Sequence, residues 1–562
     1  MTKVTNRNAV QLAIFIAFGG FLFGYDIGVI SGCLIMPDFI RRFGEIDANG
    51  EYFLSSSRQS IITSLLSAGT FVGALAQAFT SDRWGRRGSI LFWSAIFTVG
   101  VVIQTATGHS MAQITAGRFV TGLGVGALSA IVPLYNGETA PKALRGTLLV
   151  LYQLQIIIGL FLSYVLDLAT HTIPNSASWR VPVGLQLAWG LIMLSGVFFL
   201  PESPRHLLFT GRREEATKVV ATLNGVPADD PLVEELVGEL EFSIAAENAD
   251  GKATWAECFS PSLWRRTVNG MMLQFIQQLN GQNFYCASLS YLRSSFRVVK
   301  VIAKECHSCA TLIDYYGDTF FESAGTHVVC AHKSLSPYVI QVILGAVSVV
   351  GTVPALRLIE TWGRRKSLLT GALLEAACAI IAGLVGHFTL APVGTPTEQL
   401  TRRNKAGGDT LIAFAVLHVF SFAVFWGPTP WVYLGESFPL RIRPKGIALG
   451  SATNWLWNFL LSFFAPRIAA RIGPLILLVF FGMLLFGYVY VYLCIPETRG
   501  LTLEEVDELY RSGVKPWNST GWKPHLSEEA HLKVHQGRPS QAEKASTEKS
   551  GVEEAEEAVT KV

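Results

Sequence analysis

Apolar residues in this chain are gathered into long blocks instead of being spaced along one face of an amphipathic helix. Twelve blocks approach the length of about 20 residues that a helix needs to cross a bilayer. Helices that are apolar on all sides are stable in lipid, where each segment must satisfy its own backbone hydrogen bonds. The blocks lie at about 10–32, 60–80, 90–108, 112–136, 147–169, 182–200, 267–286, 337–358, 367–390, 410–434, 446–466 and 474–495. We therefore predict an all-α membrane protein with twelve transmembrane helices, for which the lipid bilayer is the solvent.

The composition agrees with this prediction and excludes several functions. Of 562 residues, half are hydrophobic and 15% are charged, whereas soluble domains carry about a quarter charged residues. The first block is too long for a cleaved signal peptide and lacks a small-residue cleavage site, so we expect it to remain as a helix. The net charge of +3 gives no indication of a nucleic-acid partner. We find no nucleophile–base set, phosphate-binding loop or metal-ligand cluster, so the sequence predicts no enzyme, cofactor or metal site.

Basic residues predict the orientation of the chain in the membrane. They are concentrated in the short loops after the second, fourth, sixth, eighth and tenth helices. Loops of this kind face the cytoplasm, and an even number of helices places both termini on that side. The clusters are 82–87, 142–145, 205–213, 364–366 and 441–445.

These boundaries predict four parts. Residues 1–200 form an N-terminal six-helix bundle, and residues 267–510 form a C-terminal one. A charged, partly helical cytoplasmic linker at 201–266 joins them. The tail at 511–562 is rich in Glu, Lys and Ser, a composition typical of disorder.

The two bundles share an internal repeat. Asp82-Arg83-Trp84-Gly85-Arg86-Arg87 returns as Glu360-Thr361-Trp362-Gly363-Arg364-Arg365. Tyr135-Asn136-Gly137-Glu138 returns as Tyr433-Leu434-Gly435-Glu436, and Pro201-Glu202-Ser203 returns as Pro496-Glu497-Thr498. Repeated halves with a binding site between them are a common design of transporters.

The repeated charges predict a cytoplasmic gate, in which ion pairs form and break as the bundles rock. The alternative is that these charges only fix the topology, which explains the arginines but not the glutamates at matched spacing. The predicted gate residues are Asp82, Arg86, Arg87, Glu138, Arg145, Glu202, Glu360, Arg364, Arg365, Glu436, Arg443 and Glu497.

In combination, these motifs and several others resemble the sugar porters of the major facilitator superfamily, with fungal hexose transporters the closest in pattern. The resemblance covers roughly residues 10–510 and implies the major facilitator fold. The sequence departs from the family pattern at Ala78, where Gly is usual, and at Ser348, where a sugar-contacting Asn is frequent. The further motifs are Gly20–Asp26, Gly117-Arg118, Pro201–Arg205, Gln277–Asn283, Gly427–Trp431, Asn454-Trp455 and Pro496–Gly500.

Amide side chains inside apolar helices are the candidates for holding a sugar. An amide offers two donors and an acceptor without charge, which matches sugar hydroxyls, and aromatic faces pack on the sugar ring. Gln277 and Gln278 are adjacent and can border one cavity. The alternative is hydrogen bonding between helices, which we accept for Gln155 and Gln341. By resemblance the sugar contacts are Gln153, Gln277, Gln278, Asn283, Tyr315 and Trp431, with Phe23, Gly427, Asn454 and Trp455 lining the same space.

Two prolines and one pair of charges bear on the mechanism. Pro428 and Pro430 remove backbone donors from the tenth helix, so we expect a break there, either as a hinge or as a kink without function.

Asp26 and Arg118 lie inside helices one and four, where an unpaired charge is costly, so we expect them to pair. In proton-coupled relatives the matching residues couple proton entry to sugar, although some facilitative relatives carry the same Asp.

One stretch interrupts the seventh helix motif. The run Gln277–Asn283 is followed by foreign sequence, and Tyr315-Tyr316-Gly317 appears only afterwards; removing 287–314 restores the register. Cys306-His307-Ser308-Cys309 permits a redox or zinc motif, and four basic residues at helical spacing permit an amphipathic surface helix. We favour a third hypothesis, a retained intron, because excision rejoins two motif halves in frame.

The sequence therefore predicts uptake of glucose or a similar monosaccharide across the plasma membrane by alternating access, coupled to a proton. The alternatives are a facilitative uniporter and a glucose sensor that binds sugar without transporting it. Sensors of this type tend to have long cytoplasmic tails, whereas this tail runs only about 50 residues past the last motif, which favours transport.

Overall fold

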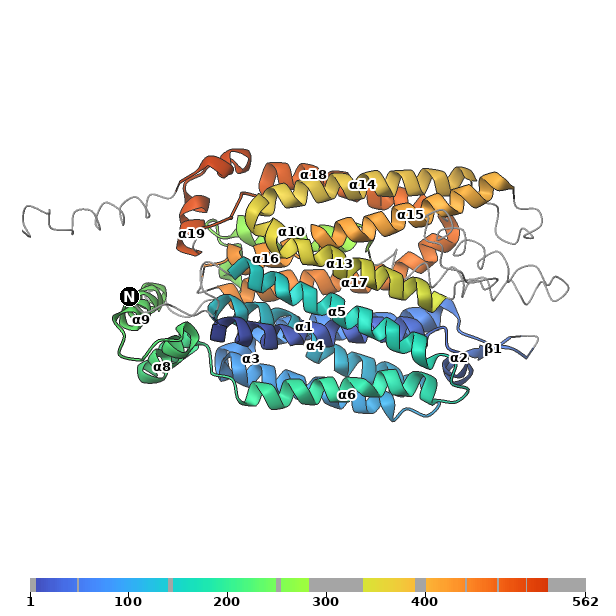
Figure 1. Ribbon diagram of the computed structural model, residues 1–562, viewed down its shortest axis with the longest axis horizontal. Coiled ribbons are helices and arrows are strands. Elements are labelled where there is room, and N and C mark those ends of the chain that lie inside the picture. The colour runs from blue at the N-terminus through green and yellow to red at the C-terminus, as the bar shows by residue number, and fades with distance from the viewer. Residues whose placement is uncertain are drawn as a thin grey trace, which may run out of the picture.

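The chain folds into long helices that run side by side along one axis (Figure 1). Apart from a two-stranded hairpin of β1 (Glu45–Ile46) and β2 (Tyr52–Phe53), every described element is helical. The computed structural model describes residues 7–47, 50–139, 145–248, 254–282, 337–389, 401–439, 442–472, 475–501 and 503–523. Asn283, Tyr315 and the predicted insertion at 287–314 lie outside these residues.

The N-terminal half contains a 50-residue helix, α3, where the sequence predicts two separate segments. At about 1.5 Å per residue it is roughly 75 Å long, more than twice the thickness of the hydrocarbon core. Its backbone leaves helical geometry at Gly85, with φ of 76°, so α3 comprises two spans joined at that residue. The helices of this half are α1 (Arg7–Cys33), α2 (Pro37–Phe43), α3 (Ser56–Thr105), α4 (Met111–Thr139), α5 (Arg145–Thr170) and α6 (Ala177–Phe198).

The C-terminal half contains the break that the prolines predict. The tenth span is divided into α15 and α16, with residues 425–428 between them. There the Gly427 N–H donates to the Phe422 carbonyl at 2.7 Å. The helices of this half are α10 (Trp264–Leu279), α13 (Pro337–Trp362), α14 (Arg364–Thr389), α15 (Arg402–Val424), α16 (Thr429–Ser437), α17 (Arg443–Ile472) and α18 (Ile476–Cys494).

The number of membrane crossings follows from length and hydropathy. Within the described residues, nine helical segments are long and apolar enough to span a bilayer, with α15 and α16 counted as one. Because α3 contributes two crossings, these segments make ten. The more polar α10 and α17 complete the twelve that the sequence predicts. The protein is thus an all-helical membrane protein.

Four glycines bring α1 into close contact with α5. Gly20, Gly24, Gly28 and Gly32 recur every four residues and therefore lie on one face of α1. A Cβ atom on Gly24 would lie 1.8 Å from the Ile156 carbonyl oxygen, so only glycine permits this approach. Small residues of this kind allow membrane helices to pack backbone against backbone. The packing fixes the rotation of α1 and hence the direction of its polar residue, Asp26.

The charged stretch after α6 forms helices at one end of the bundle, which we call the motif end because both copies of the arginine motif lie there. Figure 1 shows α8, α9, α19 and the N-terminus at this end, and α2 and β1 at the opposite end. The bounds are α7 (Pro204–Phe209), α8 (Arg213–Asn224), α9 (Pro231–Asn248), the 3₁₀ helix η2 (Ala256–Phe259) and α19 (Leu503–Arg511).

The first part of the C-terminal tail is packed against the C-terminal half, in contrast to the disorder predicted from residue 511. The 3₁₀ helix η5 (Pro516–Gly521) follows α19. Ser519 Oγ accepts a hydrogen bond from the Glu497 N–H at 2.8 Å, and Trp517 stacks on Tyr492. These contacts supply apolar burial and a backbone partner that composition does not reveal. Residues 524–562 lie outside the described part of the chain.

Candidate functional site

A cluster of amide side chains joins α10 to α17 inside the membrane domain. Asn454 Nδ2 donates to Gln274 Oε1 at 2.7 Å and to Gln277 Oε1 at 2.9 Å. Asn454 Oδ1 accepts from Gln278 Nε2 at 2.9 Å. Asn454 and Gln277 are only 2% and 4% exposed, so the cluster places uncharged donors and acceptors in a dry environment. Because the cluster carries no charge that could neutralise an ion, it is better suited to binding the hydroxyl groups of a ligand.

Gln277 connects this cluster to the break between α15 and α16. Its Nε2 donates to the carbonyl oxygens of Trp426 and Gly427, both at 2.8 Å. These carbonyls are available because the helix is interrupted there. Gln153, on α5 of the other half, lies against the same place, since a Cβ on Gly427 would be 3.3 Å from its Nε2. The sequence-predicted residues Gln153, Gln277 and Gly427 are therefore brought together across the two halves.

Aromatic side chains from both halves border the amide cluster. The Trp455 ring packs edge-on against Phe23 at 4.8 Å between centroids, and its Nε1 donates to Ser129 Oγ at 3.0 Å. Trp431 packs edge-on against Tyr152 at 5.9 Å. The Tyr152 hydroxyl is buried without a hydrogen-bond partner in the described part of the chain. The space between the halves thus combines amides, aromatic faces and one unpaired hydroxyl.

Three residues of this region are missed by the sequence analysis. Gln274 lies one turn before the Gln277–Gln278 pair, and Asn458 lies one turn after Asn454, so helical spacing carries the signal for both. Asn458 Nδ2 donates to Gln278 Oε1 at 3.2 Å, and its Oδ1 accepts from Ser67 Oγ on α3 at 2.7 Å. Tyr152 has no comparable signal, because a tyrosine in a membrane helix is unremarkable without its neighbours.

Asp26 and Arg118 form the predicted ion pair. Arg118 Nη1 lies 2.9 Å from Asp26 Oδ1, and the two side chains are 1% and 0% exposed. The same nitrogen is 3.4 Å from the Asp26 carbonyl oxygen. Pairing offsets the cost of holding either charge in the membrane interior. The pair ties α1 to α4 within the N-terminal half.

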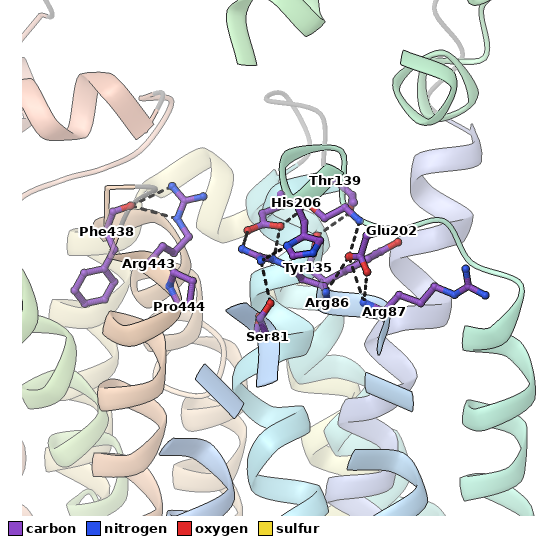
Figure 2. Close-up of polar contacts among 12 residues, drawn as sticks. Ser81, Arg86, Arg87, Tyr135, Thr139, Glu202, His206, Phe438, Arg443 and Pro444 are labelled. Atoms are coloured by element: carbon purple, nitrogen blue, oxygen red, sulfur yellow. Dashed lines mark hydrogen bonds and ion pairs between the residues drawn. The ribbon is translucent and has the colours of Figure 1, made fainter. Parts of the chain in front are cut away.

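At the motif end, Arg86, Glu138 and Glu202 form a cluster that we call the N-gate (Figure 2). Arg86 binds the Glu138 carboxylate through two nitrogens, with Nη2–Oε1 at 2.7 Å and Nε–Oε2 at 2.9 Å. Glu202 Oε1 accepts from the Arg86 N–H at 2.8 Å. A Cβ on Gly85 would lie 2.4 Å from Glu202 Oε2, and φ is 76° there, so this turn requires glycine.

The C-terminal half repeats this arrangement in Arg364, Glu436 and Glu497, which we call the C-gate. Arg364 binds Glu436 through Nη2–Oε1 at 2.7 Å and Nε–Oε2 at 3.0 Å. Glu497 Oε1 accepts from the Arg364 N–H at 2.8 Å. Gly363 has φ of 94°, and a Cβ there would again lie 2.4 Å from the glutamate. The repeat in sequence is therefore a repeat in hydrogen bonding.

A hydroxyl residue completes each gate and is absent from the sequence-predicted set. Ser203 Oγ donates to Glu138 Oε2 at 2.5 Å, and Thr498 Oγ1 donates to Glu436 Oε2 at 3.1 Å. Each hydroxyl residue directly follows the glutamate of its motif. Their matched positions in the repeat could therefore have identified them from the sequence.

The titratable groups outside the spans respond to this environment. Burial raises the pKa of the Glu202 carboxyl, while the N–H groups of Ser203, Arg86 and Arg87 oppose that rise. His206, whose Nδ1 lies 3.4 Å from Arg86 Nη1, has a pKa lowered by burial and then by the Arg86 charge.

Other predicted gate residues make contacts different from those expected. Arg87 donates through its backbone N–H to Glu202 and through its side chain to the Phe198 carbonyl at the end of α6. Arg365 donates to the Tyr492 carbonyl at 2.8 Å, near the end of α18. Arg443 Nη2 donates to the Phe438 carbonyl at 3.1 Å (Figure 2). These arginines therefore donate to carbonyls at helix ends that lack a partner within the helix, which the sequence pattern does not reveal. Arg145 begins α5, but its side chain lies outside the described residues.

Contacts between the halves close the motif end. Lys445 Nζ lies 3.0 Å from Asp82 Oδ2, and Gln77 Nε2 donates to the Pro444 carbonyl at 3.4 Å. Glu360, paired with Arg364 at 3.1 Å, lies so close to α5 that a Cβ on Gly146 would be 1.8 Å from it. Lys445 is missing from the sequence-predicted gate, because its partner across the halves is a matter of tertiary structure. At the opposite end the rings of His171 and Tyr338 are 4.3 Å apart.

Comparison with known proteins agrees with this geometry. The family profile described as "Sugar (and other) transporter" matches residues 12–304 and 288–510. The low-affinity glucose transporter of Kluyveromyces lactis is 39% identical over 513 residues, covering 91% of this chain and 84% of that protein. The high-affinity hexose transporter HXT6 of Saccharomyces cerevisiae is 37% identical, covering 91% and 83%.

Solved structures agree on the fold. The proton:xylose symporter XylE of E. coli, bound to 6-bromo-6-deoxy-D-glucose, matches with a TM-score of 0.69 and 23% identity. The match covers 90% of this chain and 100% of that chain. At this identity the likeness concerns the fold alone, which is that of the major facilitator superfamily.

Proposed function

The chain belongs to the sugar transporter family of the major facilitator superfamily, and from this membership we propose that it carries glucose or a similar hexose across the plasma membrane. The observation that supports the proposal most directly is the amide cluster around Asn454, in which Gln277 donates to the Gly427 carbonyl, beside Gln153 of the other half. Uncharged amides and aromatic faces suit a polyhydroxylated ring, and repeated halves suit alternating access.

In this proposal the motif end faces the cytoplasm and is closed. The Asp82–Lys445 bridge and the contact of Gly146 with Glu360 hold the two halves together there. Opening toward the cytoplasm must separate these contacts. The ion pairs of the N-gate and the C-gate each lie within one half, so, contrary to the sequence prediction, they hold each half rigid and do not form and break between the halves. Sugar then moves from one side to the other as the halves rock about the amide cluster.

Facilitated diffusion is our first mechanism, although the sequence alone favoured proton symport. The similar yeast proteins are named glucose and hexose transporters, and the symporter of similar fold is too distant to transfer its coupling. Proton coupling is a second candidate because Asp26 and Arg118 form a fully buried ion pair. A carboxylate in such a place either stabilises the helices or exchanges a proton with the solvent.

Uptake of radiolabelled glucose by yeast cells that lack hexose carriers tests the function. The full chain should restore saturable uptake, and Asn454→Ala should abolish it while the protein still reaches the cell surface. The matched control is Asn8→Ala, because Asn8 lies outside the site and donates to the Thr222 carbonyl at the motif end. Wild-type protein at the cell surface without uptake would contradict transport of glucose and favour another sugar or a sensor.

The external pH of weakly buffered cells then separates the two mechanisms. Facilitated diffusion predicts no alkalinisation when glucose is added. Alkalinisation that disappears in Asp26→Asn would instead establish proton symport through the first helix.

A further inference from the structure

A buried carboxyl in the C-terminal half takes no part in the sugar cluster or the gates. Glu375 lies on α14, eleven residues after Arg364, which places it about 17 Å along the helix and near the middle of the membrane. It is 0% exposed. A carboxyl at this depth is costly and requires an explanation in terms of its partners.

The partners of Glu375 are polar but carry no compensating positive charge. Its Oε2 accepts a hydrogen bond from Asn280 Nδ2 at 3.1 Å, while its Oε1 has no hydrogen-bond partner among the described residues. No lysine, arginine or histidine of the described chain forms an ion pair with it. Asp26, in contrast, has Arg118 at 2.9 Å. Within the described part of the chain, an ionised Glu375 would be a charge in the membrane interior without a counter-ion, so the packed arrangement favours the protonated acid.

Among the described residues, two other titratable groups lie close to Glu375, His418 and Cys378. His418 on α15 is fully buried, with Nδ1 3.4 Å from the Glu375 carbonyl oxygen. Cys378 lies three residues further along α14 and is 2% exposed. The facing part of α18 contributes the apolar ring of Phe480, which contacts the turn at Gly281.

Asn280 connects the acid to the helix that carries the sugar amides. It follows α10 directly, two residues after Gln278, and its Oδ1 accepts from the Gln282 N–H at 3.0 Å. Gly281 between them has φ of 95°, so the chain turns sharply where the helix ends. The amide of Asn280 thus holds the end of α10 with one side and the carboxyl of Glu375 with the other.

We propose that Glu375 is a proton-binding site of the C-terminal half and that its protonation holds the end of α10, with Gln277 and Gln278, in the sugar-binding arrangement. Loss of the proton to water leaves a carboxylate that must be hydrated, which draws the end of α10 away from α14. Return of a proton from water restores the packed arrangement. The proposal rests on the proposed function, since the sugar is the ligand whose affinity reports the change.

The alternative is that Glu375 stays protonated permanently and acts only as a structural hydrogen-bonding group. The two differ in their linkage: an exchanged proton makes glucose affinity depend on pH, by up to about tenfold per pH unit for one proton. A permanently neutral acid gives no such dependence.

Glucose binding to the purified full chain, followed by tryptophan fluorescence across a pH series, tests the proposal, because Trp431 and Trp455 lie at the site. Wild type should bind more weakly as the pH rises. Glu375→Gln, which imitates the neutral acid, should keep the low-pH affinity and reduce the slope of log Kd against pH. The reduction should appear in both the wild-type and the Asp26→Asn backgrounds, which separates this site from the first helix.

Two control variants test the neighbours. Cys378→Ala and His418→Gln should retain the wild-type slope. Equal slopes in Glu375→Gln and wild type would overturn the proposal, as would a slope that disappears in His418→Gln alone. If Glu375→Gln does not fold, Glu375→Asp serves instead, because it keeps the acid but shortens the side chain by one methylene. A dependence of glucose affinity on pH that is unchanged in Glu375→Asp would also overturn the proposal. Wild type that binds no glucose at any pH would contradict the proposed function itself.

Discussion

At the motif end the two halves are built alike, whereas in the membrane interior they hold buried acids in different ways. Arg86–Glu138 and Arg364–Glu436 are both paired through two nitrogens, with the shorter distance 2.7 Å in each. Inside the membrane, Asp26 is paired with Arg118, whereas the Glu375 carboxyl bonds only to the amide of Asn280 within the described residues. The contacts of the two halves therefore match at the motif end and differ in the membrane interior.

This difference separates two tasks. In the proposed mechanism the gates need rigid, matched geometry, because the halves would move as bodies against one another. The interior acids are instead proposed to control local helix positions, since α1 and α10 each carry residues of the proposed sugar site. Variants of the gate residues and variants of the interior acids can therefore test the two tasks separately.

The largest effect is expected from removing a gate arginine. Arg364→Ala leaves Glu436 and Glu360 without their partner, and Arg364 is only 2% exposed. Breaking a buried pair by removing one member costs about 3–5 kcal/mol. Arg86→Ala should cost less, since Glu138 is its single ion-pair partner among the described residues and Arg86 is 9% exposed. Thermal denaturation followed by size-exclusion chromatography would measure both, and equal losses would contradict the asymmetry.

A smaller but distinct effect is expected from neutralising the interior acids. Asp26→Asn leaves Arg118 buried and unpaired, which should cost about 3 kcal/mol. Glu375→Gln keeps the hydrogen-bonding shape and removes no counter-ion, so its stability should remain within about 1 kcal/mol of wild type. The same denaturation measurement compares the two, and a larger loss in Glu375→Gln would show that its carboxylate is ionised.

Removing the bridge between the halves should change stability little. Asp82 is 47% exposed in its side chain, and pairs of this kind contribute about 0.2–1 kcal/mol. Lys445→Ala should nevertheless favour opening of the motif end, because the bridge exists only when the halves are closed. Cysteine accessibility at the motif end would detect the shift, and the exchanged pair Asp82→Lys with Lys445→Asp should reverse it.

The smallest effect concerns pH and His206, which has Leu501 at the matching place in the C-terminal motif. The pKa of His206 is lowered in the folded protein, so below about pH 6.5 the unfolded chain binds more protons. The N-gate should therefore lose stability as the pH falls from that value, and His206→Leu should remove this loss. Denaturation of both proteins at neutral and mildly acidic pH measures the difference; parallel curves would show that His206 does not contribute.

Much of the site follows from the sequence, and three of the residues that it did not predict share one cause. The pairing of Asp26 with Arg118 and the break at Pro428 were predicted, because an unpaired membrane charge and a proline inside a helix each allow few solutions. Lys445, Ser67 and Tyr152 were not, because each acquires its role from a residue more than 250 positions away.

The sequence by itself determined the all-helical membrane fold, the twofold repeat and the polar residues that enter the membrane. Lipid permits only helices whose backbone groups are all hydrogen-bonded. The length of each apolar segment and the position of each polar residue within it can therefore be read directly from the sequence. Only the tertiary structure decided which of those polar residues meet. It brought Asn454 to three amides of α10, directed Arg87 and Arg365 to helix-end carbonyls, and placed the Glu375 carboxyl against Asn280. Those outcomes depend on the rotation and contact of helices, which hydropathy does not specify.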